Sequence, residues 1–156
     1  MKKRMLVISF IILIIDQLIK HLVMTSLVYR KTYSVISNFL YLTYVKNTGG
    51  AWSILSGNTI FLLLISFVCI AGLGVYLHKK NTISKLECIY YGLLFGGIIG
   101  NLIDRILYEG VIDYIGFIFG SYYFPIFNIA DICIVCGIIL LLIDGWIGEK
   151  NGIRGK

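Results

Sequence analysis

The chain has 156 residues, of which 58% are hydrophobic and only 14% are charged, and its net charge is +6 with a mean hydropathy of +0.89. So few charged side chains cannot cover a water-soluble globule of this size with a polar surface. The composition therefore excludes a disordered chain, a disulfide-stabilised miniprotein and an ordinary cytosolic enzyme, and it indicates a single integral membrane domain over residues 1–156.

Four apolar segments are each long enough, at about 1.5 Å per residue, to cross a hydrocarbon core of about 30 Å. The first follows three cations, as a secretory signal would, but no cleavage site of small residues comes after it, so we expect a retained helix. The expected membrane helices are residues 5–24, 59–78, 86–108 and 126–147.

Lys and Arg are concentrated at both termini and in the connection between the second and third helices. Short loops rich in these residues stay in the cytoplasm, so we expect both termini inside. The excess of cations suits the anionic head groups of membrane lipids and gives no sign of nucleic-acid binding. The residues concerned are Lys2, Lys3, Arg4, Lys79, Lys80, Lys85, Lys150, Arg154 and Lys156.

The two long connections then lie outside the membrane. Residues 29–46 and 114–125 are rich in Tyr, Val, Ile, Thr and Phe, which is typical of strands. Trp52 and the neighbouring aromatic residues suit the interfacial belt of a membrane protein. The expected fold is thus an all-α membrane protein with four transmembrane helices and a small extracytoplasmic β-sheet that forms a cradle.

Polar side chains gather at one depth of this topology. Charged groups are costly inside a bilayer, so their placement is informative. The clustered residues lie near the outer membrane surface, at helical spacings or in the outer connections. They are Asp16 and Lys20; Asn101, Asp104 and Arg105; Asn128 and Asp131; Asn47 and Gly49 in the loop entering the second helix; and Asp113 in the outer loop.

Part of this cluster is explained by packing alone. Asp16 with Lys20, and Asp104 with Arg105, are typical of neutral pairs that fix one helix against another. The third helix also has glycines at GxxxG spacing, which lets membrane helices approach closely. These glycines are Gly92, Gly96 and Gly100, with Gly97 on the face of Asn101.

Asp113 and Asp131 have no cation at helical spacing, so packing does not explain them. Two carboxyl groups brought close share one proton. The ionised group can then take a proton from water, while the protonated group polarises a carbonyl. An aspartic peptidase is therefore one hypothesis, and it requires no metal and no cofactor.

Five motifs in a fixed order extend this hypothesis. They cover nearly the whole chain, from about residue 6 to residue 143, and resemble the bacterial lipoprotein signal peptidase family, also called signal peptidase II. The motifs are residues 16–20 (DQLIK), 47–52 (NTGGAW), 96–105 (GGIIGNLIDR), 111–114 (VIDY) and 127–131 (FNIAD).

The resemblance implies an aspartyl endopeptidase that cuts signal peptides from prolipoproteins, just before a cysteine that carries diacylglycerol. It implies a multi-pass protein of the bacterial cytoplasmic membrane, with its site near the extracytoplasmic face and inhibition by globomycin. We expect a monomer. The implied catalytic pair is Asp113 and Asp131; the substrate-binding or supporting residues are Asn47, Gly49, Asn101, Arg105 and Asn128; and Asp16, Lys20 and Asp104 would fix the helices.

Four positions differ from the residues that this family more often has. None removes a catalytic group, so they bear on local packing and substrate preference rather than on the reaction. They are Gly50, Ser53, Ile132 and Cys133.

Two other function classes remain as alternatives. Cys133 and Cys136 form a C-x-x-C that a thiol oxidoreductase could use, although Cys69 and Cys88 supply no second outer pair. A transporter would need polar residues through the whole membrane depth, yet the second helix has only Ser66. Zinc binding lacks further Cys or His ligands.

Overall fold

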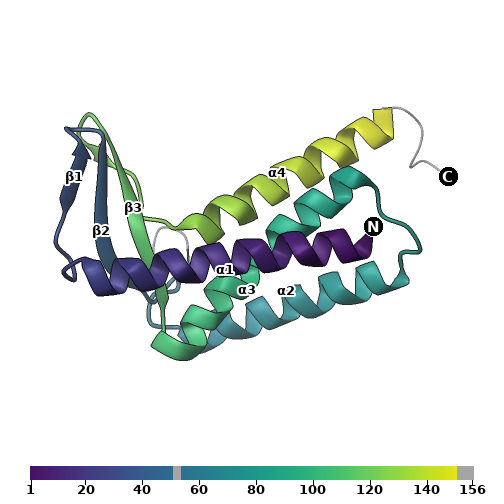
Figure 1. Cartoon of the computed structure of the whole chain (residues 1–156), viewed down its shortest axis with the longest axis horizontal. Helices are drawn as coiled ribbons and strands as arrows, with labels where there is room; N and C mark the ends of the chain where they lie inside the picture. Colours follow the sequence, from purple (N-terminus) through teal and green to yellow (C-terminus); the bar gives the residue numbers. More distant parts are fainter. Residues whose placement is uncertain (51–53, 151–156) are drawn as a thin grey trace.

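The structure is a computed structural model, and it describes residues 1–50 and 54–150. Four long helices and one small sheet make up these residues (Figure 1). Trp52, which we expect in the interfacial belt, lies outside the described residues. The elements are α1 (Lys2–Ser26), β1 (Tyr33–Ile36), β2 (Leu40–Asn47), α2 (Thr59–Lys79), α3 (Lys85–Tyr108), β3 (Val111–Phe119), β4 (Tyr122–Tyr123) and α4 (Ile129–Lys150).

All four helices are long and apolar enough to cross a membrane, which confirms the predicted fold class. Helix α3 is central and packs against α1, α2 and α4. In the apolar stretch of each helix, 61% of the residues are buried in α3 but only 11% in α2 and in α4. The outer helices therefore expose apolar side chains, such as Ile60, Val68 and Leu142, on the surface that faces lipid.

The glycines of α3 let its neighbours approach closely, as predicted. A Cβ atom added at Gly92 or Gly96 would lie within 2.8 Å of a side chain of α1. A Cβ atom at Gly97 would lie 2.6 Å from the carbonyl oxygen of Ala130, in the first turn of α4. The backbone of α3 thus lies directly against both α1 and α4.

The four strands form one antiparallel sheet in the order β1-β2-β3-β4. Figure 1 places this sheet at one end of the molecule, opposite the start of α1 and the connection between α2 and α3. Two site residues expected in loops belong to the sheet instead. Asp113 pairs with Val45, because β3 begins three residues before the expected segment 114–125. Asn47 pairs with Val111, because β2 ends one residue after the expected segment 29–46.

The opposite end is tied together by polar contacts. Ser84 caps α3 in a reciprocal box with Glu87, and Glu87 also pairs with Lys80. The Tyr90 hydroxyl group donates to Asp144 Oδ2 at 3.1 Å, which joins α3 to α4. Asp144 therefore contributes to the packing of α4 on α3 at this end.

Candidate active site

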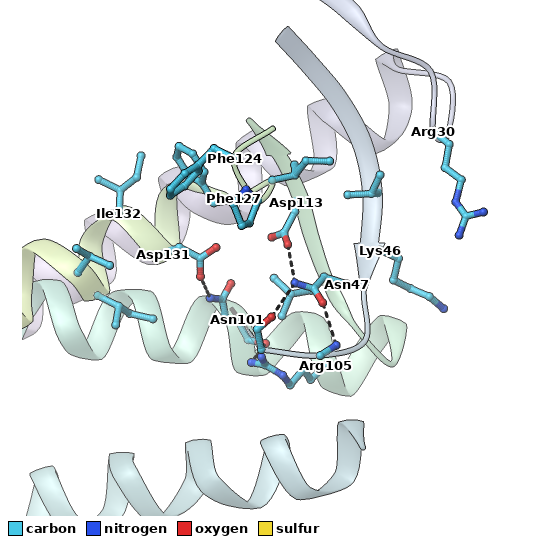
Figure 2. Close-up of a pocket in the computed structure, with 18 of the residues that line it drawn as sticks. Arg30, Lys46, Asn47, Asn101, Arg105, Asp113, Phe124, Phe127, Asp131 and Ile132 are labelled. Atoms are coloured by element: carbon cyan, nitrogen blue, oxygen red, sulfur yellow. Dashed lines mark hydrogen bonds between the residues drawn. The ribbon is translucent and has the colours of Figure 1, made fainter. Parts of the chain in front are cut away.

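A cavity of about 670 Å³ lies between the sheet and the ends of α3 and α4 nearest to it. Asp113 and Asp131 both line it, and Figure 2 shows their carboxyl groups pointing into the same space. Asn47, Gly49, Asn101 and Arg105 line it as well. The structure therefore brings together residues that the sequence places on four separate segments.

Asp113 is carried by β3, where it is only 3% exposed. Its Oδ2 accepts a hydrogen bond of 3.0 Å from the Asn47 amide, and its Oδ1 accepts one of 2.7 Å from the Asn128 amide. Burial, and then the nearby charge of Asp131, raise the pKa of Asp113 to about 7, against the lowering effect of the two amides. The carboxyl group is thus placed to change protonation near neutral pH.

Asp131 lies in the first turn of α4. Its Oδ1 accepts a hydrogen bond of 2.7 Å from the Asn101 amide, and its Oδ2 accepts one of 3.2 Å from the backbone nitrogen of Asn128. In return, the Asp131 backbone nitrogen donates to Asn128 Oδ1 at 2.9 Å. This reciprocal pattern is a capping box, which begins the helix and fixes the carboxyl group at once.

Asn128 links the two carboxyl groups. It is fully buried, and its amide nitrogen donates to Asp113 Oδ1 and, at 3.3 Å, to Asn101 Oδ1. A bridge between Ile115 and Phe127, with hydrogen bonds of 2.9 and 3.0 Å, places Asn128 next to β3. This bridge is the reason why two aspartates 18 positions apart line one cavity.

Lys20 is the buried cation behind the cavity, at 1% exposure. Its ammonium group lies 2.8 Å from Asp16 Oδ2, 2.8 Å from Asp104 Oδ2 and 2.9 Å from Asn101 Oδ1. The expected Asp16–Lys20 pair is therefore present. The expected pairing of Asp104 with Arg105 is wrong, because Asp104 turns toward α1 and pairs with Lys20 instead.

The carboxylates that pair with Lys20 also hold the elements that carry the aspartates. Asp16 Oδ1 accepts from the Ala130 backbone nitrogen at 3.1 Å, and Asp104 Oδ2 accepts from that of Ile112 at 3.0 Å. The sequence-based list of site residues omitted Gln17, which donates to Asp104 Oδ1 at 3.0 Å. The sequence feature that could have identified Gln17 is its position as a polar residue beside Asp16 within an apolar helix.

Asn47 and Arg105 form another wall of the cavity. Asn47 Oδ1 accepts a hydrogen bond of 2.9 Å from the backbone nitrogen of Gly49, which orients the amide toward Asp113. Arg105 Nη1 donates to the carbonyl oxygen of Asn101 at 3.3 Å. Within residues 1–50 and 54–150, Arg105 makes no ion pair within 4.0 Å, so its charge is open to a ligand in the cavity.

The rest of the lining is apolar and extends away from the aspartates. Phe124 and Phe127 come from the segment before α4, and Ile132 and Val135 come from α4 itself. Cys136 also lines the cavity with a free thiol. Among the described residues no cluster of three or more His, Cys, Asp or Glu side chains suits a metal ion.

Two carboxyl groups that line one cavity can activate water and a carbonyl together. One must be ionised to accept a proton from water, and the other must be protonated to donate to the carbonyl oxygen. An arginine and several amides nearby can hold a peptide backbone. The arrangement therefore suits hydrolysis of a peptide bond by acid–base chemistry.

Comparisons with known proteins agree with this geometry. The model of the family described as signal peptidase (SPase) II matches residues 8–147. A lipoprotein signal peptidase of Bacillus pumilus is 42% identical over 145 residues, which is 93% of this chain and 94% of the relative. One of Listeria monocytogenes is 38% identical over 145 residues, or 92% of this chain and 94% of the relative.

Solved structures show the same similarity. Two structures described as bacterial membrane enzymes superpose on the chain with TM-scores of 0.86 and 0.79, at 34% and 35% sequence identity. The first covers 94% of this chain and 90% of the solved chain. The second covers 90% of each.

Proposed function

The chain belongs to the signal peptidase II family, and we propose that Asp113 and Asp131 are the two carboxyl groups with which it hydrolyses its substrate. Members of the family process the signal peptides of prolipoproteins, and this chain is a membrane-embedded aspartic endopeptidase of that kind. The single observation that carries the assignment is the shared cavity: both carboxyl groups face it, and Asn128 contacts both residues.

The proposed reaction divides the proton transfers between the pair. One carboxylate takes a proton from water as the water oxygen attacks the scissile carbonyl carbon, and the other carboxyl group donates to the carbonyl oxygen. Asn47, Asn101 and Asn128 support the pair through the hydrogen bonds described above, and Gly49 orients Asn47. We assign Arg105 to the carbonyl groups of the substrate backbone, because its charge faces the cavity.

Asp16, Lys20 and Asp104 act as supports in this proposal. Asp16 contacts the backbone of α4 and Asp104 contacts that of β3, so they position the elements that carry both aspartates. Lys20 pairs with both and also contacts Asn101. Neither Asp16 nor Asp104 lines the cavity. Their part in catalysis is therefore indirect.

The proposed orientation puts the sheet and the cavity on the extracytoplasmic side of the bacterial cytoplasmic membrane. The cations that favour the cytoplasm lie at the other end of the molecule, on the first residues of α1 and around the connection between α2 and α3 (Figure 1). Both termini are then cytoplasmic. A lipid-modified cysteine at the outer end of a signal helix would lie at the depth of the two aspartates.

The apolar part of the cavity suits a substrate that remains partly in lipid. We propose that it accepts a prolipoprotein segment whose cysteine carries diacylglycerol, with the bond before that cysteine next to the aspartates. Globomycin, which the family resemblance implies as an inhibitor, would occupy the same cavity. We further propose a monomer in a single integral membrane domain, since both aspartates and the amides that support them come from the described residues of this one chain.

The test is cleavage of a diacylglyceryl-modified prolipoprotein by the purified protein in detergent. Asp113→Asn and Asp131→Asn are nearly isosteric but cannot exchange the proton, so each should lower the rate by at least about 100-fold. Mass spectrometry of the product should place the cut before the modified cysteine. If a folded variant at either position cleaves at the wild-type rate, that residue is not one of the two catalytic carboxyl groups.

A matched control addresses the oxidoreductase alternative. Cys133→Ser with Cys136→Ser removes both thiols of the C-x-x-C without touching either aspartate. Cys136 lines the cavity, but neither thiol takes part in the proposed proton transfers and serine is close to cysteine in size. This double variant should therefore still cleave before the modified cysteine. Loss of cleavage in a folded double variant would favour redox chemistry.

A further inference from the structure

The two aspartates of the proposed pair lie in different electrostatic environments. Asp113 is on a strand, and its contacts are two neutral side-chain amides. Asp131 is in the first turn of a helix and accepts from a backbone nitrogen as well as from an amide. Equal sharing of a proton is not expected for groups placed so differently.

The N-terminus of α4 favours a negative charge on Asp131. Asn128 occupies the N-cap position, since its carbonyl oxygen accepts from the Ile132 backbone nitrogen at 3.3 Å. Asp131 therefore lies three residues into the helix, where the aligned peptide dipoles stabilise an anion. Asp113 lies within β3, which continues to Phe119, so its carboxyl group is not part of a helix N-terminus.

Lys20 fixes the direction of the Asn101 amide. An ammonium group can only donate, so the amide atom 2.9 Å from it must be the oxygen. The same oxygen accepts from Asn128 at 3.3 Å. The amide nitrogen is then obliged to face Asp131 Oδ1 at 2.7 Å, where it acts as a donor to a carboxylate.

The other charged groups near the cavity do not reverse this difference. Arg30 and Lys46 also line the cavity, but they point away from both aspartates (Figure 2). Asp16 and Asp104 are both paired with Lys20. Arg105 lines the cavity that the two aspartates share and makes no ion pair with Asp113 within 4.0 Å. The pKa of Asp113, raised to about 7 by its burial, agrees with a group that is protonated below neutral pH.

We propose that Asp131 is the ionised member of the pair and the general base, that Asp113 is the protonated member and the general acid, and that Lys20, acting through Asn101, is the positioning residue that fixes these roles. This inference rests on the proposed function. It assigns the proton to one of the two aspartates, which the family membership alone does not do.

The resulting reaction balances. Asp131 takes one proton from water, the water oxygen bonds to the scissile carbonyl carbon, and Asp113 gives its proton to the carbonyl oxygen, which leaves a neutral gem-diol. Asp131 then gives its proton to the amide nitrogen as the carbon–nitrogen bond breaks. Asp113 takes a proton back from a gem-diol hydroxyl, so a carboxylic acid and a free amine leave and both aspartates return to their first state.

Matched variants test the assignment through the pH profile of kcat/KM. Asn101→Ala removes a donor from Asp131, so it should move the acidic limb, where the base becomes ionised, upward by about one pH unit. Asn47→Ala removes a donor from Asp113, so it should move the basic limb, where the acid loses its proton, upward by a similar amount. The opposite pairing of variants and limbs, or equal shifts of both limbs in both variants, would overturn the proposal.

A second measurement needs neither activity nor a folded Asn101 variant. The wild-type protein labelled with carbon-13 at the aspartate carboxyl carbons has five such groups. The resonances lost in Asp113→Asn and Asp131→Asn identify the two of interest. At pH 6, the Asp113 resonance should be that of a neutral carboxyl group and the Asp131 resonance that of a carboxylate.

The two failures are distinguishable. If the wild-type protein cleaves no prolipoprotein, the proposed function fails, and the carbon-13 titration still reports which aspartate holds the proton. If it cleaves but the two resonances are reversed or titrate together over the same pH range, the proposed function stands and the assignment of roles is overturned.

Discussion

Lys20 can be buried because every hydrogen of its ammonium group has an acceptor. Asp16, Asp104 and Asn101 supply one oxygen each at 2.8–2.9 Å. A buried charge is tolerated when it is paired and hydrogen-bonded, and two carboxylates without this cation would be strongly destabilising. The contacts with Asp104 and Asn101 join α1 to α3, so one side chain serves both the packing and the orientation of the site.

Asp113 should make the stability of the protein depend on pH. Its pKa of about 7 in the folded state lies above its ordinary value of 3.8. Its contribution to stability is therefore complete below about pH 4 and is lost as the pH rises through 7. Asp113→Asn has no such loss, so its melting temperature relative to wild type should increase between pH 4 and pH 8.

The measurement is thermal unfolding in detergent over this range. Any fixed cost of placing an amide next to Asn47 and Asn128 affects every pH equally, so the informative quantity is the slope of the difference with pH. The free energy involved is on the order of a few kcal/mol. A difference that is flat across the range would contradict a raised pKa for Asp113.

At the scale of elements, α4 is positioned at its first turn by three other segments. The backbone nitrogen of Ile129 donates to the Tyr114 hydroxyl at 3.3 Å, and that of Ala130 donates to Asp16. The next nitrogen, of Asp131, is capped by Asn128. Side chains from β3, α1 and the cap thus satisfy the first three N–H groups, which sets where Asp131 lies.

Gly97 should be required for the contact between α3 and α4. In Gly97→Ala the new methyl group would lie 2.6 Å from the Ala130 carbonyl oxygen, so the first turn of α4 must move away. A displacement of the Asp131 carboxyl group by about 1 Å can cost about 100-fold in rate. We expect such a loss in the cleavage assay, with the helical circular dichroism signal kept.

Gly72→Ala is the matched control, because nothing lies within 4 Å of a Cβ atom at that position on α2. Alanine favours a helix more than glycine does, so this variant should be as active and at least as stable as wild type. Equal activities of the two variants would show that close packing at Gly97 does not position Asp131.

On the scale of the whole molecule, the outer surface is that of a membrane protein. Exposed apolar side chains cover the outward faces of α1, α2 and α4, for example Phe10 at 63%, Val68 at 71% and Leu142 at 63% exposure. The polar cluster, in contrast, lies at the end that carries the sheet. This distribution suits a site that opens to one side of the bilayer.

The orientation of the chain can be tested directly. In a background with all four cysteines replaced by serine, Ser121→Cys places a thiol in the exposed turn between β3 and β4. Asn81→Cys places one in the exposed connection between α2 and α3. With the sheet outside, a membrane-impermeant maleimide should label Ser121→Cys in intact cells and Asn81→Cys only after lysis.

Labelling in the opposite pattern would invert the orientation. The active site would then face the cytoplasm, and the substrate proposed above could not reach it after export. Labelling of both positions in intact cells would indicate a leaking preparation, so a thiol on a cytoplasmic protein should be followed in the same cells.

Composition and residue spacing alone were enough to predict the membrane helices, the family and the two aspartates. Long apolar runs must form helices in lipid, because no water is present to satisfy backbone groups, and this made the four membrane helices readable. The order of five short motifs indicated the family, and the unpaired Asp113 and Asp131 stood out because a charge in an apolar setting needs a reason. These features are local, so they appear in the sequence itself.

The contacts between distant segments needed the tertiary structure. Lys20 could have paired with Asp16 alone, yet the packing of α1 on α3 adds Asp104 and Asn101, and it leaves Arg105 to the cavity. Asp113 belongs to a strand rather than a loop because β3 pairs with β2. The direction of each amide, and with it the difference between the two aspartates, depends on donors from other elements, which no local pattern encodes.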